Sequence, residues 1–298
     1  MGSRPYARLV VNHSQNCNMR CTWCHEEGMQ GTDPRGELSA RQIVETSEKL
    51  YRCGVRKFKI VGGEPTLRND LEDIIAGLRA IDSTIDLSMV TNGSRLATKA
   101  LAYRDAGVNR INVSLFSLNP RFFKLNVGPT SLMDRVDKGI RLAQEVGILG
   151  KLNHVYHNRT ELDLVLAYAA SVGTRLNVLN RIPSMDSEEF TPVNTLLDLL
   201  STYPTKAVWI EDDPDSLPVT VMQLLGSAEI EVKHLELGEQ KKLKSCLDCS
   251  VRHKCKEGIF AVRVTPAGEL QPCIVRDDNT INALQATSGE LAHFLAAL

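Results

Sequence analysis

The sequence lacks any apolar stretch long enough to cross a lipid bilayer. A transmembrane helix needs about 20 consecutive apolar residues, and no run in this chain reaches that length. The N-terminal segment MGSRPYARLVVNH also lacks the apolar core of a signal peptide. We therefore expect a cytoplasmic protein with no membrane partner.

The chain also lacks an excess of charge of either sign. It carries 35 Lys and Arg residues against 36 Asp and Glu residues. Without a basic surplus or a long run of like charges, the composition gives no reason to expect a nucleic-acid partner. The 298 residues are 43% hydrophobic, which is enough for one large domain or one domain with an appendage.

Cysteine is the residue type that stands out instead, with eight in the chain. In a cytoplasmic protein this number points to metal or redox chemistry rather than to disulfides. Cys53 stands alone near the end of a helical pattern, and we expect it to pack in the core. The other cysteines form two groups, which are Cys17, Cys21 and Cys24, and then Cys246, Cys249, Cys255 and Cys273.

The first group lies in the string CNMRCTWC, directly after the strand-like run RLVVNHSQ. Soft thiolates favour iron–sulfur clusters or zinc over hard cations. A 4Fe–4S cluster usually takes four cysteines, so three would leave one iron open to a small molecule. A zinc knuckle and a set of buried thiols remain the alternatives at this point.

Apolar, β-branched runs alternate with helical patterns along most of the chain, which predicts the α/β class. Six such units predict a parallel sheet in the form of a partial (β/α)6 barrel. We expect a barrel core over 1–215 and a small C-terminal auxiliary Fe–S domain over 216–298. The candidate strands are Arg8–His13, Lys57–Val61, Asp86–Thr91, Arg110–Leu115, Lys151–Val155 and Arg175–Asn180.

A second motif, Gly62-Gly63-Glu64-Pro65, follows the second candidate strand. Glycines allow the backbone to approach a ligand closely, and a carboxylate there accepts hydrogen bonds from an ammonium group. Taken alone, the motif is more typical of an ordinary turn. Its place after a strand and downstream of the cysteine string makes a binding role the better interpretation.

Together, CNMRCTWC (including Trp23) and GGEP resemble the signatures of the radical S-adenosylmethionine (SAM) enzymes. The resemblance implies that Cys17, Cys21 and Cys24 bind a 4Fe–4S cluster, whose open iron is chelated by SAM. An electron, delivered by a donor such as flavodoxin or ferredoxin, then cleaves SAM to a 5′-deoxyadenosyl radical, which removes a hydrogen atom from substrate. By the same resemblance, the SAM contacts would be Gly62, Gly63, Glu64, Thr91, Asn92, Ser114 and Asn153.

The second cysteine group reads CLDCSVRHKC, followed by Cys273. Four thiolates at this spacing would ligate one cluster or one zinc ion. The pattern is similar to the auxiliary domains called SPASM or twitch, and the presence of a first cluster favours a second 4Fe–4S cluster here.

Two further segments, KIVGGEPTLRNDL and RVTPAGELQPCIVRDD, resemble the GTP 3′,8-cyclases of molybdenum-cofactor synthesis. By this resemblance, Lys59, Arg68 and Arg263 would meet the substrate. The sequence departs from the group in its fourth auxiliary cysteine, in Ala261 where an arginine pair is expected, and in its ending, ELAHFLAAL.

These departures lead us to expect a radical SAM enzyme that acts on a small polar metabolite, nucleotide- or sugar-like, in cofactor or natural-product biosynthesis. The alternatives are a GTP 3′,8-cyclase proper, a peptide-modifying maturase of the SPASM type, and a non-enzymatic Fe–S or zinc structural protein. No catalytic residue beyond the cluster ligands is assigned from the sequence.

Overall fold

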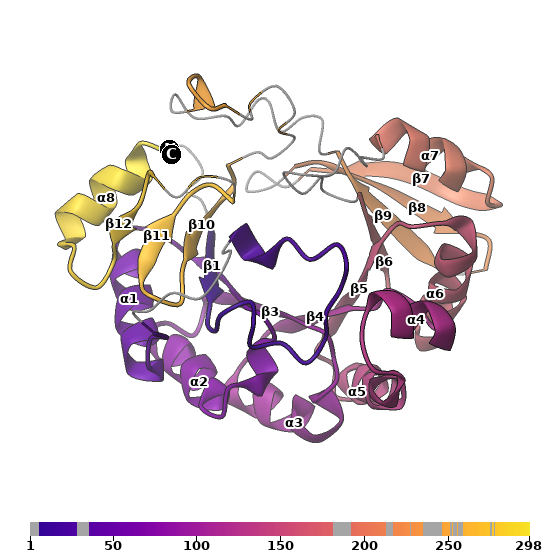
Figure 1. Cartoon of the computed structure of the whole chain (residues 1–298), viewed down its shortest axis with the longest axis horizontal. Helices are drawn as coiled ribbons and strands as arrows, with labels where there is room; N and C mark the ends of the chain where they lie inside the picture. Colours follow the sequence, from indigo (N-terminus) through magenta and orange to yellow (C-terminus); the bar gives the residue numbers. More distant parts are fainter. Residues whose placement is uncertain are drawn as a thin grey trace.

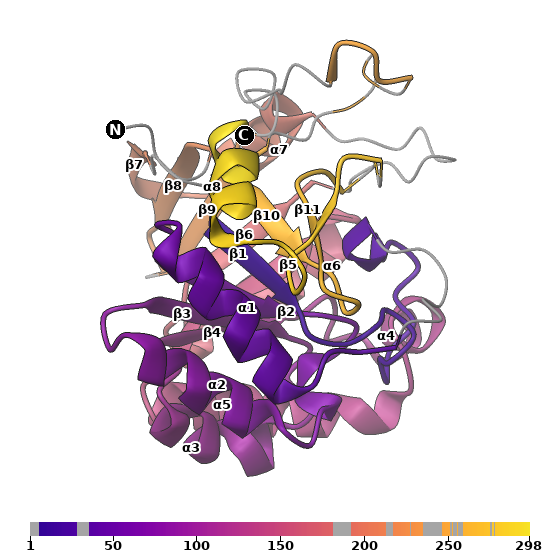
Figure 2. The same ribbon diagram turned by 90° about the vertical axis from the view of Figure 1, so that its left-hand side faces the viewer.

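The computed structural model of the chain is shown in Figures 1 and 2. It describes residues 6–28, 36–180, 192–212, 217–226, 228–234, 246–250, 252, 255, 259–274, 276 and 278–298. Within these residues, the strands form one curved sheet, and helices lie along its outer side (Figure 1). This mixed α/β arrangement confirms the expected fold class.

The sheet has twelve strands in the order β12-β11-β10-β1-β2-β3-β4-β5-β6-β9-β8-β7. Their bounds are β1 Tyr6–Val10, β2 Lys57–Val61, β3 Asp86–Thr91, β4 Arg110–Ser114, β5 Leu149–Val155, β6 Leu176–Leu179, β7 Thr205–Glu211, β8 Val219–Leu224, β9 Glu229–Lys233, β10 Ala261–Val264, β11 Glu269–Gln271 and β12 Ile281–Asn282. The helices are α1 Ala40–Arg52, α2 Leu71–Ile81, α3 Leu96–Ala106, α4 Pro120–Asn126, α5 Met133–Glu145, α6 Arg159–Val172, α7 Val193–Ser201 and α8 Ser288–Ala296, with short 3-10 turns η1 Glu26–Gly28, η2 Pro65–Leu67 and η3 Thr130–Leu132.

All six strands expected from the sequence are present, with β1 starting two residues earlier than predicted and ending three residues earlier. The pairings from β10 through β1 to β6 and β9 are all parallel. Strands β9 and β10 therefore extend the parallel sheet at its two sides, although both come from the part of the chain beyond residue 215. The division into domains 1–215 and 216–298 stays a prediction.

The alternation of side chains along a strand explains how this sheet separates its core from its inner face. On β1, Ala7 and Leu9 are buried, whereas Arg8 between them is only partly buried. On β2, Phe58 is buried in the same way and Lys59 is partly exposed. Because successive side chains point to opposite faces, the apolar ones pack against the helices and the basic ones line the inside of the curved sheet.

Local signals fix where the covering helices begin and end. Ser39 caps α1 in a reciprocal capping box with Gln42, an arrangement that typically stabilises a helix by about 1 kcal/mol. Helix α3 ends at Gly107 with φ of 106°, and α6 ends at Gly173 with φ of 67°. Glycine occupies this left-handed region without a steric penalty, so each helix stops where the next strand must start.

Candidate active site

A cavity of about 1070 Å³ lies on the inner face of the curved sheet, and every one of the eight parallel strands contributes side chains to its wall. This volume is at the upper end of the usual range for ligand pockets, about 300–1,000 Å³. The cavity can therefore hold more than one small molecule.

The three N-terminal cysteines all line this cavity, in the loop between β1 and η1. Backbone hydrogen bonds shape the loop and attach it to the end of α4. The amide of Cys24 donates to the carbonyl of Cys21 at 3.1 Å, and the amide of Arg20 donates to the carbonyl of Val127 at 2.8 Å. The loop thus presents Cys17, Cys21 and Cys24 to one common space.

The chemistry of these thiols fits an iron–sulfur cluster. Burial, followed by the neighbouring thiolates of Cys24 and Cys17, raises the pKa of Cys21 to about 12. The charges of the three thiolates act on one another, and a cationic centre would relieve their repulsion by holding them deprotonated. Within the described residues, no three His, Cys, Asp or Glu side chains meet closely enough to hold a single metal ion.

The glycines of the GGEP motif allow this turn to press against the cysteine loop. A Cβ atom on Gly62 would lie 2.0 Å from Oδ1 of Asn12, and one on Gly63 would lie 2.4 Å from the carbonyl oxygen of His13. Both distances are too short for any side chain. Gly62 and Gly63 therefore set the relative position of the two loops, and both line the cavity.

Glu64 is the hydrogen-bonding centre of this end of the sheet and is only 1% exposed. Its carboxylate accepts from the amides of Thr66 at 3.1 Å and Asn92 at 2.7 Å, and from the hydroxyls of Thr66 and Thr91. Burial raises the pKa of this carboxyl, while these donors lower it. Glu64 thus ties β2 to β3 through protein contacts, and its expected bond to SAM stays a prediction.

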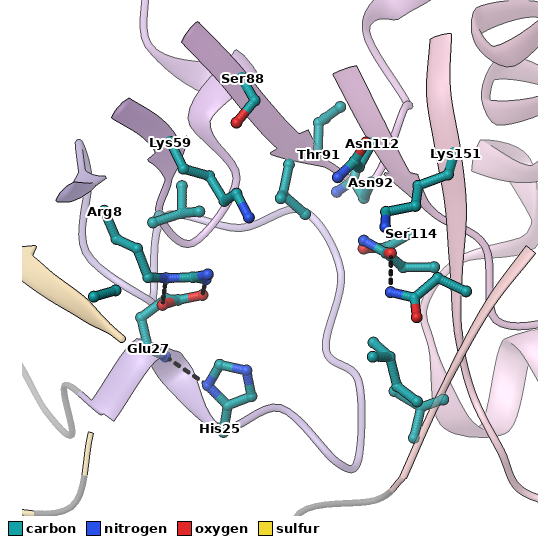
Figure 3. A pocket seen from close by; sticks show the side chains of 18 of the residues that line it. Arg8, His25, Glu27, Lys59, Ser88, Thr91, Asn92, Asn112, Ser114 and Lys151 are labelled. Carbon is teal, nitrogen blue, oxygen red and sulfur yellow. Dashed lines mark hydrogen bonds and ion pairs between the residues drawn. The ribbon is translucent and has the colours of Figure 1, made fainter. Parts of the chain in front are cut away.

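The remaining expected SAM contacts also line the cavity, and Figure 3 shows three of them at the ends of neighbouring strands, namely Thr91, Asn92 and Ser114. The side chain of Asn92 donates to Oδ1 of Asn18 at 2.8 Å, which links β3 to the cysteine loop. Asn153 on β5 accepts a hydrogen bond from Asn177 at 2.9 Å. Polar amide and hydroxyl groups therefore follow the strand ends around this wall.

A row of basic side chains crosses the opposite part of the wall. In the sheet register, Arg263 on β10 is the partner of Arg8 on β1, and Arg8 is the partner of Lys59 on β2. All three line the cavity. Burial and the nearby charge of Arg8 lower the pKa of Lys59 to about 8, although the nearby Tyr6 acts in the opposite direction. The Lys59 ammonium lies 5.0 Å from the Tyr6 ring centre.

Glu27 is the acidic partner of this basic row. Its carboxylate accepts from Nε of Arg8 at 3.0 Å and from a second Arg8 nitrogen (Figure 3), and it lies 3.6 Å from Nε of Arg263. Burial opposes its ionisation, but the charges of Arg8, His25 and Arg263 lower the pKa of Glu27 to about 2. Glu26 and Glu27 both have φ of 53°, a left-handed conformation that costs a non-glycine residue about 1–2 kcal/mol.

Two basic residues on the β5 and β6 part of the wall have acidic partners on other strands. Lys151 pairs with Glu231 on β9. Arg175, which directly precedes β6, lies 2.9 Å from carboxylate oxygens of both Glu211 and Glu229. The charges of these two residues are therefore neutralised by glutamates of β7 and β9.

Arg68, which we expected to meet the substrate, is not among the residues that line the cavity. Its guanidinium forms a two-point ion pair with Asp70, at 2.8 and 2.7 Å, and donates to the carbonyls of Leu38 at 3.0 Å and Val11. These contacts attach the GGEP turn to the start of α2 and to the segment that leads into α1. Arg68 thus holds this turn in place, and its expected contact with the substrate stays a prediction.

The C-terminal cysteines lie outside the lining of the cavity, although Ile274, next to Cys273, belongs to it. The amide of Cys249 donates to the carbonyl of Cys246 at 3.3 Å. The pKa of Arg276 is raised first by its bond to Asp278 and further by the charges of both Cys249 and Cys273. The charges of Cys249 and Cys273 thus act on the same guanidinium, while the full ligand set, with Cys246 and Cys255, stays a prediction.

Sequence reasoning missed Arg8 and Glu27. A signal for Arg8 was available, because a charged residue inside an otherwise apolar parallel strand indicates a side chain that faces an internal cavity. For Glu27 no local signal exists, because its partner Arg8 lies 19 residues earlier in the chain and only the folding of the intervening loop brings the two together.

Comparison with known proteins identifies the family to which this site belongs. The profile of the radical SAM superfamily matches residues 11–166. The chain belongs to the radical SAM superfamily. A probable GTP 3′,8-cyclase of Metallosphaera sedula is 33% identical over 295 residues, covering 96% of this chain and 86% of its own length. A probable GTP 3′,8-cyclase of Thermococcus kodakarensis is 31% identical over 299 residues, covering 95% and 89%.

Solved structures resemble the chain over nearly its whole length. Streptococcus suis SuiB bound to its precursor peptide SuiA superposes with a TM-score of 0.64 at 15% identity, covering 96% of this chain; the chain spans 64% of SuiB. The protein anSMEcpe with bound AdoMet gives 0.62 at 16% identity, covering 96% of this chain and 80% of its own. At such identities the likeness concerns the fold alone.

The chain is therefore a radical SAM enzyme, and this excludes the non-enzymatic alternative. Membership of the superfamily implies one 4Fe–4S cluster and SAM, for which Cys17, Cys21 and Cys24 are the fitting ligands. Among the described helices, none has the length and apolar character needed to span a membrane. The cytoplasmic location, the electron donor and the lack of nucleic-acid or membrane partners stay predictions.

Proposed function

We propose that this radical SAM enzyme acts on GTP as a GTP 3′,8-cyclase. The sequence led us to place a general nucleotide- or sugar-like metabolite first and the cyclase second. The named relatives, which are about one-third identical over most of the chain, favour the reverse order. The substrate is then a purine nucleoside triphosphate.

The observation that carries this proposal is the row of basic residues on adjacent strands, Arg263, Arg8 and Lys59. A triphosphate brings several negative charges to one end of a ligand, and arginine offers paired N–H donors that match phosphate oxygens. Three cationic side chains on one wall of a buried cavity supply complementary charge, and they do so without the second arginine that Ala261 replaces.

At the strand ends, a bound 4Fe–4S cluster with SAM supplies the radical that abstracts hydrogen from the substrate. The residues of the chain position and shield the reactants. Asn112, Asn153 and Asn177 line the wall away from the basic row and offer amides to the sugar and base. The surrounding sheet excludes water from the reacting atoms.

The C-terminal cysteines, Cys246, Cys249, Cys255 and Cys273, complete the proposal as ligands of a second 4Fe–4S cluster in an auxiliary domain over 216–298. The effect of the charges of both Cys249 and Cys273 on Arg276 supports such a grouping. Iron analysis of the reconstituted protein tests it: we expect about eight irons per chain, as two four-iron clusters require. About four would leave this group as a zinc or structural site.

The direct test of function uses anaerobically reconstituted protein, dithionite and SAM. GTP, GDP, guanosine and ATP are added in turn, and 5′-deoxyadenosine and nucleotide products are quantified. We expect GTP to accelerate 5′-deoxyadenosine formation most and to yield a cyclised guanine nucleotide. Cys21→Ser should abolish both signals. If guanosine serves as well as GTP, or if no nucleotide accelerates the reaction, the proposal is wrong.

A further inference from the structure

Glu27 occupies the place where an anionic ligand would bind the basic row. Its two carboxylate oxygens engage two nitrogens of Arg8 (Figure 3), and one of them lies 3.6 Å from Nε of Arg263. Side chains of Arg8 and Glu27 are only 17% and 11% exposed. A phosphate group that approaches the same edge of the Arg8 guanidinium would compete with Glu27 for these two donors.

The neighbouring donor is not satisfied by this arrangement. Arg263 is 9% exposed, and its Nε has no hydrogen-bond partner among the described residues. The Glu27 oxygen nearest to it is 3.6 Å away, which is beyond hydrogen-bond range. A buried guanidinium nitrogen without a partner is unfavourable, and a tetrahedral phosphate reaching both arginines would satisfy it.

The segment that carries Glu27 differs from those of the other acidic residues in the wall. Glu231, which pairs with Lys151, is fixed within β9 of the sheet. Glu27 lies in the short turn η1, and its backbone has φ of 53° and ψ of 22°. A strained turn is held by its contacts, so loss of the contact to Arg8 would favour its release.

We propose that Glu27 occupies the anion subsite of Arg8 and Arg263 in the substrate-free enzyme and that a phosphate group of the substrate replaces it there. The identity of the anion rests on the proposed function. Glu27 is then a specificity-determining residue, because a ligand must carry enough charge to displace a carboxylate. Nucleoside polyphosphates meet this condition, and nucleosides and monophosphates do not.

The test is a binding measurement on the reconstituted, anaerobic protein with tripolyphosphate, GTP and GMP as probes. Glu27→Gln removes the competing charge, and the apparent affinity of a site rises when its blocked fraction falls. We expect tripolyphosphate and GTP to bind Glu27→Gln about tenfold more tightly than they bind the unchanged protein. The ratio of the affinities for GTP and GMP should be smaller in the variant. Glu27→Asp, which keeps the charge but shortens its reach, should give an intermediate gain if Glu27→Gln folds poorly.

Glu45→Gln is the matched control, because Glu45 pairs with Arg41 on the exposed face of α1 at 2.7 Å. It changes the net charge equally and should leave all three affinities unchanged. Equal or weaker binding of tripolyphosphate by Glu27→Gln would overturn the inference and would make Glu27 a support for Arg8. Tighter binding without any GTP-dependent product would retain the inference and reject the cyclase assignment alone.

Discussion

Two parts of the cavity wall contain basic side chains, and they differ in how these are neutralised. On the β5 and β6 side, Lys151 and Arg175 pair with glutamates held on β7 and β9. On the β10, β1 and β2 side, Arg8 and Arg263 share Glu27, which comes from a turn, and Lys59 lies beside the ring of Tyr6. The first side is neutralised by the sheet itself, whereas the second keeps an excess of positive charge.

This difference separates structural charge from binding charge. Burying an ion pair inside a wall fixes neighbouring strands and leaves no donor for a ligand. A group of cations with too few acidic partners creates a positive potential inside a low-dielectric cavity, and it attracts anions. Basic residues therefore indicate a phosphate site by their lack of fixed partners rather than by their number.

The largest effect expected from this comparison is on triphosphate binding. Arg8→Gln should weaken GTP binding about 100-fold, since it removes a buried partner of the phosphate charge. Arg175→Gln should leave the affinity nearly unchanged. Equilibrium dialysis measures both. Because Arg8→Gln leaves Glu27 without a partner, the double variant with Glu27→Gln serves as a folding control, and weak binding should persist in it. Equal losses at Arg8 and Arg175 would contradict the distinction.

Arg175, which should contribute little to GTP binding, should contribute to the stability of the folded protein. Arg175→Gln leaves Glu211 and Glu229 without their cation and Glu231 with Lys151 alone, and we expect the free energy of unfolding to fall by about 2 kcal/mol. Chemical denaturation measures it. Arg41→Gln, which removes the exposed pair with Glu45 on α1, is the control and should change stability by less than about 0.5 kcal/mol. An equally small loss at Arg175 would show that its pairs are not structural.

Binding at the basic row should weaken in alkali. Burial and the nearby Arg8 lower the pKa of Lys59 to about 8, although Tyr6 acts in the opposite direction. Lys59 therefore loses its positive charge as pH rises through about 8. Burial raises the pKa of Tyr6, but the nearby cations bring it to about 7, and its phenolate adds repulsion in the same direction. We expect GTP affinity to fall about tenfold between pH 7 and pH 9.

Lys59→Arg keeps its charge through this range and should flatten the fall, whereas Tyr6→Phe should leave only the Lys59 component. A GTP affinity that is constant from pH 7 to pH 9 in the unchanged protein would place the triphosphate away from Lys59.

The smallest expected effect is on acid stability. The pKa of Glu27 is lowered from 4.5 to about 2, so its ionised form stabilises the folded protein above about pH 4.5, and this contribution is lost as pH falls towards 2. The unchanged protein should exceed Glu27→Gln in unfolding free energy by about 1 kcal/mol at neutral pH, and the difference should close in acid. Urea denaturation at several pH values measures it. A difference that does not vary with pH would contradict the assigned pKa.

Much of the cavity could be predicted because its residues belong to short motifs. Cys17, Cys21 and Cys24 are close in the chain, and Gly62, Gly63 and Glu64 follow a readable strand. The pairing of β10 with β1 could not be predicted, because register between distant strands leaves no local signal. It is this pairing that brings Arg263 beside Arg8.

Some contacts depend on tertiary structure that the sequence does not show. Arg68 was expected at the substrate because of its neighbours in sequence, and in the fold Asp70 and two carbonyls accept hydrogen bonds from it. Strand β9 was not predicted although its residues alternate between polar and apolar. The cationic partners Arg175 and Lys151 explain why its acidic residues are stable inside the wall.

A structure of the reconstituted enzyme with GTP and SAM tests the central claim most directly. The account predicts the triphosphate against Arg8, Arg263 and Lys59, with the Glu27 carboxylate withdrawn from Arg8. A triphosphate bound elsewhere in the cavity, with the Arg8–Glu27 pair intact, would contradict it.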